Sequence, residues 1–328
     1  MSAEAARTGK ELIDATRPYA VESKAQSWLQ LVVTLVAWLG LVAVLTQPIF
    51  WPARFLLAIV CGLVEVRMFI LYHDHMHGAL LRSSAVAHAF FTAYGVWILA
   101  PPKVWRETHN YHHAHTAQLV GSHIGSFPTM TVAQWQQATP EQRRQYAFTR
   151  HPLTVLNAYF TAFLLEMCLL SFKRAPRKRW DSLLAAFVAL GIAVGTISIW
   201  GFSVWFWAIF LPHYVACAAG AYLFYAQHNY PDLEIQPREL WSYDRAALRS
   251  SSYMRLGPVL RWFTGNIGYH HVHHLNSGIP FYRLPEAMQA IPELQSPGVT
   301  DLSPTSIREC FALKLWDPVQ KRMVGYPG

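Results

Sequence analysis

Several stretches of this 328-residue chain are long enough and apolar enough to cross a lipid bilayer. A spanning helix needs about 20 mostly apolar residues, and four stretches meet this requirement: residues 27–47, 55–72, 182–200 and 202–225. Only the second carries charges, on Glu65 and Arg67. Charged residues make up 14% of the chain, whereas a soluble domain usually carries about 25%. The sequence therefore predicts an all-α integral membrane protein.

Two further apolar stretches, residues 83–102 and 153–172, are harder to place, and the distribution of cations helps to orient them. Residues 173–179 hold five cations in a short connection, which is typical of a cytoplasmic loop. The turn around residues 200–201 has no charge, so we expect it on the opposite side. The last apolar stretch then returns to the cytoplasmic side, where both termini are also expected.

Most of the 16 histidines lie in three short clusters, at residues 73–77, 109–115 and 270–274. If residues 83–102 spanned the bilayer, the second cluster would emerge on the face away from the other two. A single metal site therefore requires residues 83–102 and 153–172 to lie in the interface without crossing. This gives four spanning helices in two hairpins, beneath a cytosolic cap that carries the histidines. Six crossings remain open if the clusters act separately.

The rest of the chain predicts one membrane domain, residues 23–328, preceded by a short, mobile, polar head at residues 1–22. The opening residues lack the apolar core of a signal peptide. The four cysteines are far apart and suggest no disulfide framework, so a reduced, cytosol-facing protein is expected. The net charge of +8 is concentrated beside apolar segments, where it fits anionic lipid head groups better than nucleic acid.

The spacing of the histidines predicts metal binding. His109, His112 and His113 repeat the spacing of His270, His273 and His274, and His73 and His77 form an i, i+4 pair on one helical face. Eight imidazoles are too many for a four-coordinate zinc site, so their number favours two metals. Imidazole suits zinc, copper, iron and nickel alike. No HExxH motif of a zinc protease is present. A pH-sensitive surface or an adventitious metal patch is the alternative.

These clusters resemble the three histidine boxes of the membrane fatty acid desaturase family. The boxes here are His73-Asp-His-Met-His77, His109-Asn-Tyr-His112-His113 and His270-His-Val-His273-His274. Trp105-Arg106 before the second box and residues 263–275 around the third strengthen the resemblance, which covers about residues 55–284 and is closest to bacterial acyl-lipid desaturases of the Δ12 or ω6 type. The motifs are specific for the superfamily and less so for the reaction, because hydroxylases, ketolases and acetylenases share them.

The resemblance implies a non-haem centre of two Fe ions that uses O2 and two electrons on an acyl chain. The iron ligands that it implies are His73, His77, His109, His112, His113, His270, His273 and His274, with His228 as a further ligand after the last spanning helix. Relatives have an asparagine four residues before the equivalent of His228, which reaches iron through water. Here that position is Phe224, and Asn266 is a candidate substitute.

We expect other polar residues either to support the metal ligands or to have structural roles. Ligating histidines usually donate their second N–H to a neighbouring acceptor, and Asp74, Glu107 and Asp232 are candidate partners. His75, His115 and His271 are expected to form hydrogen bonds around the site, and His88, His123, His151 and His213 to be packed or interfacial. Glu65 is a candidate support for the metal site, because it lies two turns before His73 on a similar helical face; Arg67 cannot face the same direction.

Three functions follow as hypotheses. The first is a membrane fatty acyl desaturase, whose substrate is linked to lipid, CoA or a carrier protein. The second is a di-iron hydroxylase or ketolase acting on a lipid, alkane or carotenoid. The third is a membrane metal-binding or transport protein without redox turnover. No haem-binding or dinucleotide motif is visible, so a separate electron donor such as ferredoxin is expected.

Overall fold

The computed structural model describes residues 6–119, 121 and 124–327. The α-helices are α1 Gly9–Thr16, α2 Lys24–Leu45, α3 Trp51–His77, α4 Ala85–Trp97, α5 Pro102–His115, α6 Val132–Gln137, α7 Pro140–Thr149, α8 Pro152–Leu156, α9 Ser171–Arg174, α10 Trp180–Trp200, α11 Phe202–Trp205, α12 Leu211–Gln227, α13 Tyr243–Arg249, α14 Pro258–Phe263, α15 His270–Leu275, α16 Leu284–Ala290 and α17 Pro304–Ala312.

The remaining elements are short. Two π-helical segments, η2 (Tyr159–Leu170) and η3 (Phe206–Phe210), interrupt or extend the apolar helices, and three 3-10 turns are η1 (Arg17–Ala20), η4 (Phe281–Arg283) and η5 (Pro292–Leu294). Strand β1 (Tyr253–Met254) pairs in parallel with β2 (Val299–Thr300), and β3 (Leu315–Asp317) pairs antiparallel with β4 (Arg322–Val324). The chain is therefore mainly helical, as predicted.

Among the described residues, four helices are long and apolar enough to cross a membrane: α2, α3, α10 and the continuous run Phe202–Gln227 formed by α11, η3 and α12. They correspond to the four predicted stretches and confirm that part of the prediction. Helices α4 and α5 pass the same test only together, across a bend of 89°, so the count rises to five if this pair is one span. Residues 153–172 are divided among α8, η2 and α9.

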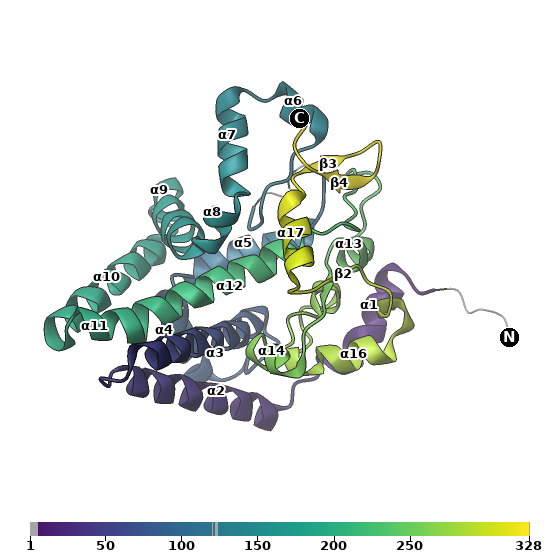
Figure 1. Cartoon of the computed structure of the whole chain (residues 1–328). Helices are drawn as coiled ribbons and strands as arrows, with labels where there is room; N and C mark the ends of the chain where they lie inside the picture. The colour runs from purple at the N-terminus through teal and green to yellow at the C-terminus, as the bar shows by residue number, and fades with distance from the viewer. Residues whose placement is uncertain (1–5, 120, 122–123, 328) are drawn as a thin grey trace.

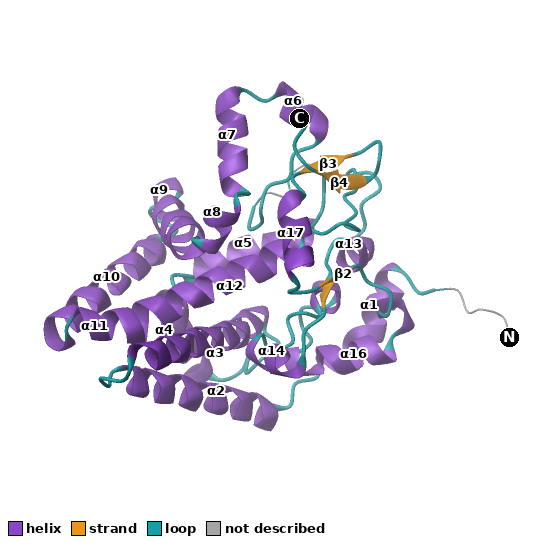
Figure 2. Ribbon diagram, viewed as in Figure 1, coloured by secondary structure: helices purple, strands orange, loops and turns teal. Residues whose placement is uncertain are grey.

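The long helices lie together, and the shorter elements gather at one end of them (Figure 1; Figure 2). Helix α3 packs against both α2 and α12, and its last turn carries the first histidine cluster. The helix ends there because Gly78 adopts a left-handed φ of 77° and its N–H bonds back to the carbonyls of Asp74 and His75. A residue without a Cβ accepts this conformation at little cost.

The N-terminal head is folded in its described part, contrary to the expected mobility. Helix α1 buries Leu12 and packs beside α13. The backbone N–H of Gly9 donates to Asp244 at 2.9 Å, and Arg7 forms a salt bridge with Glu293 at 2.8 Å. Burial of an apolar side chain together with these contacts holds the head against the helices that surround the third histidine cluster. The boundary after residue 22 stays a prediction.

Candidate metal centre

Nine histidines from four parts of the chain converge in two adjacent groups. In the first group, one ring nitrogen from each of five histidines lies within 4.8 Å of all the others; its members are His73, His77, His109, His113 and His273. In the second group, the same holds for His112, His228 and His274. His270 joins it, because its Nε2 lies 2.9 Å from that of His228 and 3.1 Å from that of His274. The structure thus brings together every histidine that the sequence singled out as a ligand.

The second and third histidine clusters, which have the same spacing, each contribute histidines to both groups, but in opposite proportions. On α5, His109 and His113 are one turn apart and face the first group, whereas His112 faces the second. On α15, only His273 faces the first group, while His270 and His274, again one turn apart, face the second. Residues four apart on a helix share a face. Each of these helices therefore contributes to both groups, so neither group is formed by one cluster alone.

More nitrogens converge in the first group than hydrogen bonds among the rings can pair. In the first group, Nε2 of His109 lies 3.1 Å from Nε2 of both His73 and His113. A neutral imidazole has one donor and one acceptor, so a cluster of five such nitrogens leaves lone pairs facing lone pairs. The Nε2 of His77 is buried without a hydrogen-bond partner among the described residues. A cation between the nitrogens would satisfy them all, which is the arrangement that a metal site requires.

The pKa values of the histidines also favour metal binding. Burial holds the pKa of His270, His273 and His274 well below the usual range, and lowers that of His228 to about 4. These rings are therefore neutral at ordinary pH and have a free lone pair, which is the form that binds metal. Five nitrogens on one side and four on the other suit a pair of ions of a metal that imidazole prefers, such as iron, zinc or copper.

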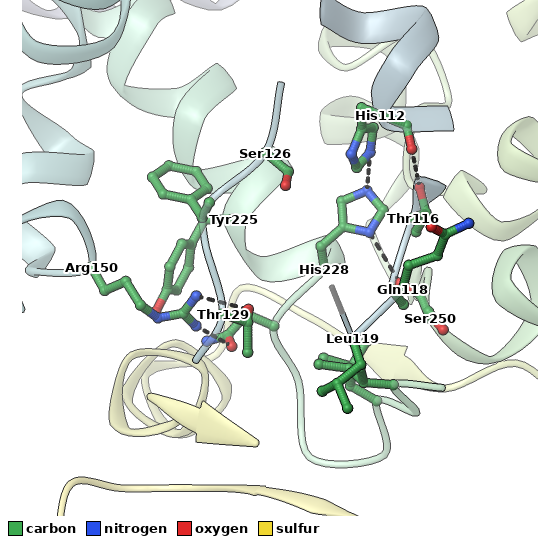
Figure 3. A pocket seen from close by; sticks show the side chains of 15 residues that line it. His112, Thr116, Gln118, Leu119, Ser126, Thr129, Arg150, Tyr225, His228 and Ser250 are labelled. Carbon is green, nitrogen blue, oxygen red and sulfur yellow. Dashed lines mark hydrogen bonds between the residues drawn. The ribbon is translucent and has the colours of Figure 1, made fainter. Parts of the chain in front are cut away.

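Neighbouring groups fix the orientation of several rings. Asp74 accepts from Nδ1 of His73 at 3.0 Å and, through its other oxygen, from the backbone N–H of Phe281 at 2.7 Å. The sequence predicted this partner. It missed the carbonyl of Ser250, which lies 3.0 Å from Nδ1 of His228 (Figure 3), because nothing local links residues 22 positions apart.

Two further contacts to the rings carry a local signal. Thr116 lies one turn after His112, donates to its carbonyl at 2.6 Å and lies 3.4 Å from Nδ1 of His274. Trp105 lies one turn before His109 and stacks on its ring, with centroids 4.3 Å apart. Both positions are four residues from a predicted ligand, so helical spacing could have identified them.

The other two carboxylates predicted to support ligands do not contact them. Glu107 forms salt bridges with Lys178 and Arg179 at 2.9 and 3.3 Å, and Asp232 is exposed. Both are charges of the protein surface. Glu65 is likewise engaged elsewhere, since its carboxylate accepts from the indole of Trp38 at 3.0 Å. Helical spacing predicted Glu65 on a suitable face of α3, but its carboxylate forms a hydrogen bond with Trp38 of helix α2.

Arg67 connects α3 with α2 and α14. Its guanidinium donates to Thr34 at 3.1 Å and also to Gln30 and to the carbonyl of Trp262, whose ring lies beneath it at 4.4 Å. These partners explain how a buried cation is accommodated in α3 without an acid.

The histidines within the clusters that were not predicted as ligands point away from both groups. His75 faces the carbonyl of Leu80 at 2.9 Å, His115 that of Tyr111 at 2.9 Å, and His271 that of Leu294 at 3.0 Å. They form hydrogen bonds, as predicted, but to the backbone of loops and helices and not to the ligands.

The isolated histidines have local roles. His151 accepts from the N–H of Leu153 at the start of α8, and His213 is buried between the rings of Trp97 and Tyr159. His88 lies 3.4 Å from His75. His123 lies outside the described residues.

Neither the position of the relatives' asparagine nor the candidate substitute Asn266 supplies a polar group at the site. Phe224 occupies the predicted position, and its ring lies 4.9 Å from that of His112 and 5.2 Å from that of His228. Asn266 is engaged elsewhere: it has a left-handed φ of 54°, and its amide donates to the carbonyl of Phe281 at 3.2 Å. The expectation that Asn266 substitutes is therefore not supported, because backbone geometry directs its side chain to a neighbouring turn.

Long apolar helices and two groups of histidines that could each hold a metal ion define the class as a membrane protein with a candidate metal centre. The comparisons make this class specific. A model of the family described as fatty acid desaturase matches residues 49–301, and the chain belongs to this family.

Individual relatives agree with the family match. The chain is 29% identical to a fatty acid desaturase of Bacillus subtilis, over 97% of this chain and 90% of the relative. It is 24% identical to an sn-1 oleoyl-lipid 12-desaturase of a Synechocystis species, over 84% and 79% of the two chains. It is also 24% identical to an sn-1 acyl-lipid omega-3 desaturase (ferredoxin) of a Nostoc species, over 83% and 70%. The resemblance seen in the histidine boxes is thereby confirmed, including its closeness to Δ12-type enzymes, and the family implies an oxidoreductase.

Proposed function

We propose that this protein is an O2-dependent desaturase that introduces a double bond into a lipid-linked fatty acyl chain. The observation that carries the proposal is the convergence of nine histidine rings in two adjacent groups at the ends of apolar helices. Its relatives are named for the desaturation of acyl lipids, which supports a lipid-linked substrate over one carried by CoA or a carrier protein.

We propose two non-haem iron ions as the cofactor, one in each group. His73, His77, His109, His113 and His273 would hold the first, and His112, His228, His270 and His274 the second. When bound, the irons supply the oxidising power needed to break an unactivated C–H bond. In the overall reaction, the acyl chain loses two hydrogens, and O2 takes these together with two electrons and two protons to form two waters.

The residues of the chain bind, orient and shield. Asp74, Ser250 and Thr116 hold the rings of His73, His228 and His274 in fixed orientations, which strengthens a metal site. The aromatic rings of Trp105 and Phe224 lie directly against ligand rings. They shield the rings that they contact from water, which suits a strongly oxidising reaction.

The proposed electron donor is a ferredoxin, because a relative carries this donor in its name. We also propose that the histidine groups and both termini face the cytoplasm. The five cations of residues 173–179 support this orientation, because Lys178 and Arg179 of that connection contact Glu107 on the histidine-bearing helix α5. A reduced ferredoxin would then reach the site from the cytosol.

Expression in a host that lacks polyunsaturated lipids, followed by mass spectrometry of its lipids and iron analysis of the purified protein, tests the proposal. We expect products lighter by two hydrogens and about two irons per chain. Products that gain one oxygen would identify a hydroxylase, products that gain one oxygen and lose two hydrogens a ketolase, and metal flux without product a transport protein.

Variants connect the chemistry to the histidine groups. His273→Ala should remove product and lower the iron content, because the ring belongs to the first group. His115→Ala is the matched control, since His115 stacks on Tyr111 and points away from both groups. Full activity of His273→Ala would contradict the proposal.

A further inference from the structure

The first histidine group comes near the surface at a cavity of about 280 Å³. The cavity lies where the end of α3 meets the following turn and the starts of α4 and α5, and its lining residues are His75, Met76, His77, Gly78, Arg82, His88 and Arg106. His77 is half-buried, whereas the other four histidines of its group are buried. The cavity thus gives access to the first group through the edge of one ring.

This cavity is cationic. Its lining includes two arginines and no acidic residue. Among the described residues, neither Arg82 nor Arg106 forms a salt bridge, and both are exposed; Arg106 lies 3.5 Å from the sulfur of Met76. A carboxylate on this side, that of Glu22, accepts from the backbone N–H of Leu81 at 2.6 Å. The two guanidinium groups are therefore available to an anionic partner.

Further cations extend this surface. Lys103 lies one turn before Arg106 on α5, with its ammonium 5.0 Å from the ring of Trp180. Lys178 reaches the same helix through its salt bridge to Glu107, so the connection at residues 173–179 lies beside α5. We refer to Arg82, Lys103, Arg106 and Lys178 as the basic face. Arg82 and Arg106 line the cavity itself, Lys103 lies one turn before Arg106, and Lys178 is paired with Glu107, the carboxylate of this face.

We infer that the basic face is the docking surface for the electron donor, a small acidic redox protein such as a ferredoxin, and that its electrons enter through His77. The inference rests on the proposed function. Complementary charge increases the rate of encounter and selects the partner. Docking here would bring the partner against the half-buried ligand of the first group. Two dockings deliver the two electrons of one turnover, each oxidising one reduced iron–sulfur cluster.

An anionic lipid head group could also bind arginines, but the position of the cavity argues against it. A head group held beside His77 would place the ester end of the acyl chain next to the first group. The proposed reaction takes place far along the chain, as the names of the 12- and omega-3-desaturases indicate for the relatives. A soluble partner has no such conflict, since it must only bring its cluster close to the metal.

Charge reversal at the basic face tests the inference. The intact protein in nanodiscs is titrated with a recombinant plant-type [2Fe–2S] ferredoxin at low and high salt, and the Kd is measured for the original chain, Arg106→Glu and Arg82→Glu. We expect each variant to weaken binding at least tenfold at low salt, with a smaller difference at high salt because salt screens exposed charges. Arg144→Glu is the control, because Arg144 is an exposed cation of α7 outside the basic face.

Turnover separates docking from other roles of the same residues. Arg106→Glu should raise the KM for ferredoxin at least tenfold, with the iron content and the turnover driven by dithionite unchanged. An unchanged Kd in both variants overturns the inference. An equal loss of turnover with ferredoxin and dithionite also overturns it, because the face would then serve the lipid substrate. If the original chain makes no product with either reductant, the proposed function fails, while the Kd values still decide whether the face binds ferredoxin.

Discussion

The guanidinium of Arg150, which Figure 3 labels together with His228, donates a hydrogen bond of 2.5 Å to the side-chain oxygen of Asn229, the residue that follows His228. The amide of Asn229 in turn donates to the carbonyls of Cys310 and Leu313 at 2.5 and 3.1 Å. The end of α7 and the segment after α17 are thereby joined at the residue next to a proposed ligand. Arg150, Asn229 and Cys310 are buried, so their hydrogen bonds hold the position of His228 from outside the metal groups.

Replacement of this guanidinium should weaken both the fold and the second histidine group. Arg150 is buried, and it also donates to the carbonyl of Pro128 at 2.8 Å. Arg150→Ala leaves buried acceptors unsatisfied and opens a cavity, which should cost about 2–4 kcal/mol of unfolding free energy. The midpoint of thermal unfolding measures the loss of stability, and the iron content measures the weakening of the second group.

Two further variants complete this test. Arg150→Lys should show a smaller loss, because it keeps the charge and some of the donors. Arg144→Ala, on the exposed side of α7, should change neither quantity. An Arg150→Ala protein with normal stability and two irons would show that the network does not support the site.

Asp74 should control the affinity of the first group. In Asp74→Asn, only the amide oxygen can accept a hydrogen bond. Either His73 or the N–H of Phe281 would therefore face the amide NH2, which is itself a donor. Loss of such a partner of a metal ligand typically lowers metal affinity 10–100-fold, and we expect a decrease in this range in a chelator competition titration. Asp232→Asn is the control, because that carboxylate is exposed. Equal affinities of the two variants would refute the role of Asp74.

Gly268 should be sensitive to a single added methyl group. A Cβ at this position would lie 2.5 Å from the carbonyl oxygen of Met254. The two residues are already close, because the N–H of Met254 donates to the carbonyl of Gly268 at 2.8 Å in the loop before His270. We expect Gly268→Ala to cost about 1–3 kcal/mol through overpacking and to lower the iron content by displacing His270. In Gly257→Ala the new Cβ meets nothing within 4 Å, so a change below about 1 kcal/mol is expected. The free energies of unfolding of both variants, measured by denaturation in detergent, test this prediction.

Acid should release the N-terminal head before it affects the rest of the fold. Hydrogen bonds from Arg7 lower the pKa of Glu293 from 4.5 to about 2. Because the folded pKa lies below the unfolded one, the ion pair stabilises the fold fully above about pH 4.5 and loses this contribution as the pH falls toward 2. An accessible pair of this kind contributes up to about 1 kcal/mol.

Hydrogen exchange of α1 between pH 5 and 3 measures this release. Protection of α1 should decrease with acid in the original chain. In Glu293→Gln it should be low already at pH 5 and should vary less with pH. The same acid dependence in both proteins would rule out Glu293 as the cause.

The sequence alone predicted the membrane helices and the histidines that converge in the two groups. Uncharged stretches of about 20 residues have few alternatives to spanning helices, because every backbone polar group must be satisfied within the bilayer. The spacing of His109, His112 and His113 likewise fixes which rings share a helical face. These are local properties of the chain, so they could be read from short windows.

Tertiary structure decided how the histidines are shared between the two groups and which residues support them. Helices α5 and α15 approach each other so that His109 and His113 meet His273, while His112 meets His270 and His274, and no local pattern specifies that approach. The roles predicted for Glu107, Asp232 and Asn266 were wrong for the same reason. Proximity in sequence to a ligand does not say where a side chain points once a neighbouring helix or turn offers it a closer partner, and Ser250 gained its role from the folded backbone alone.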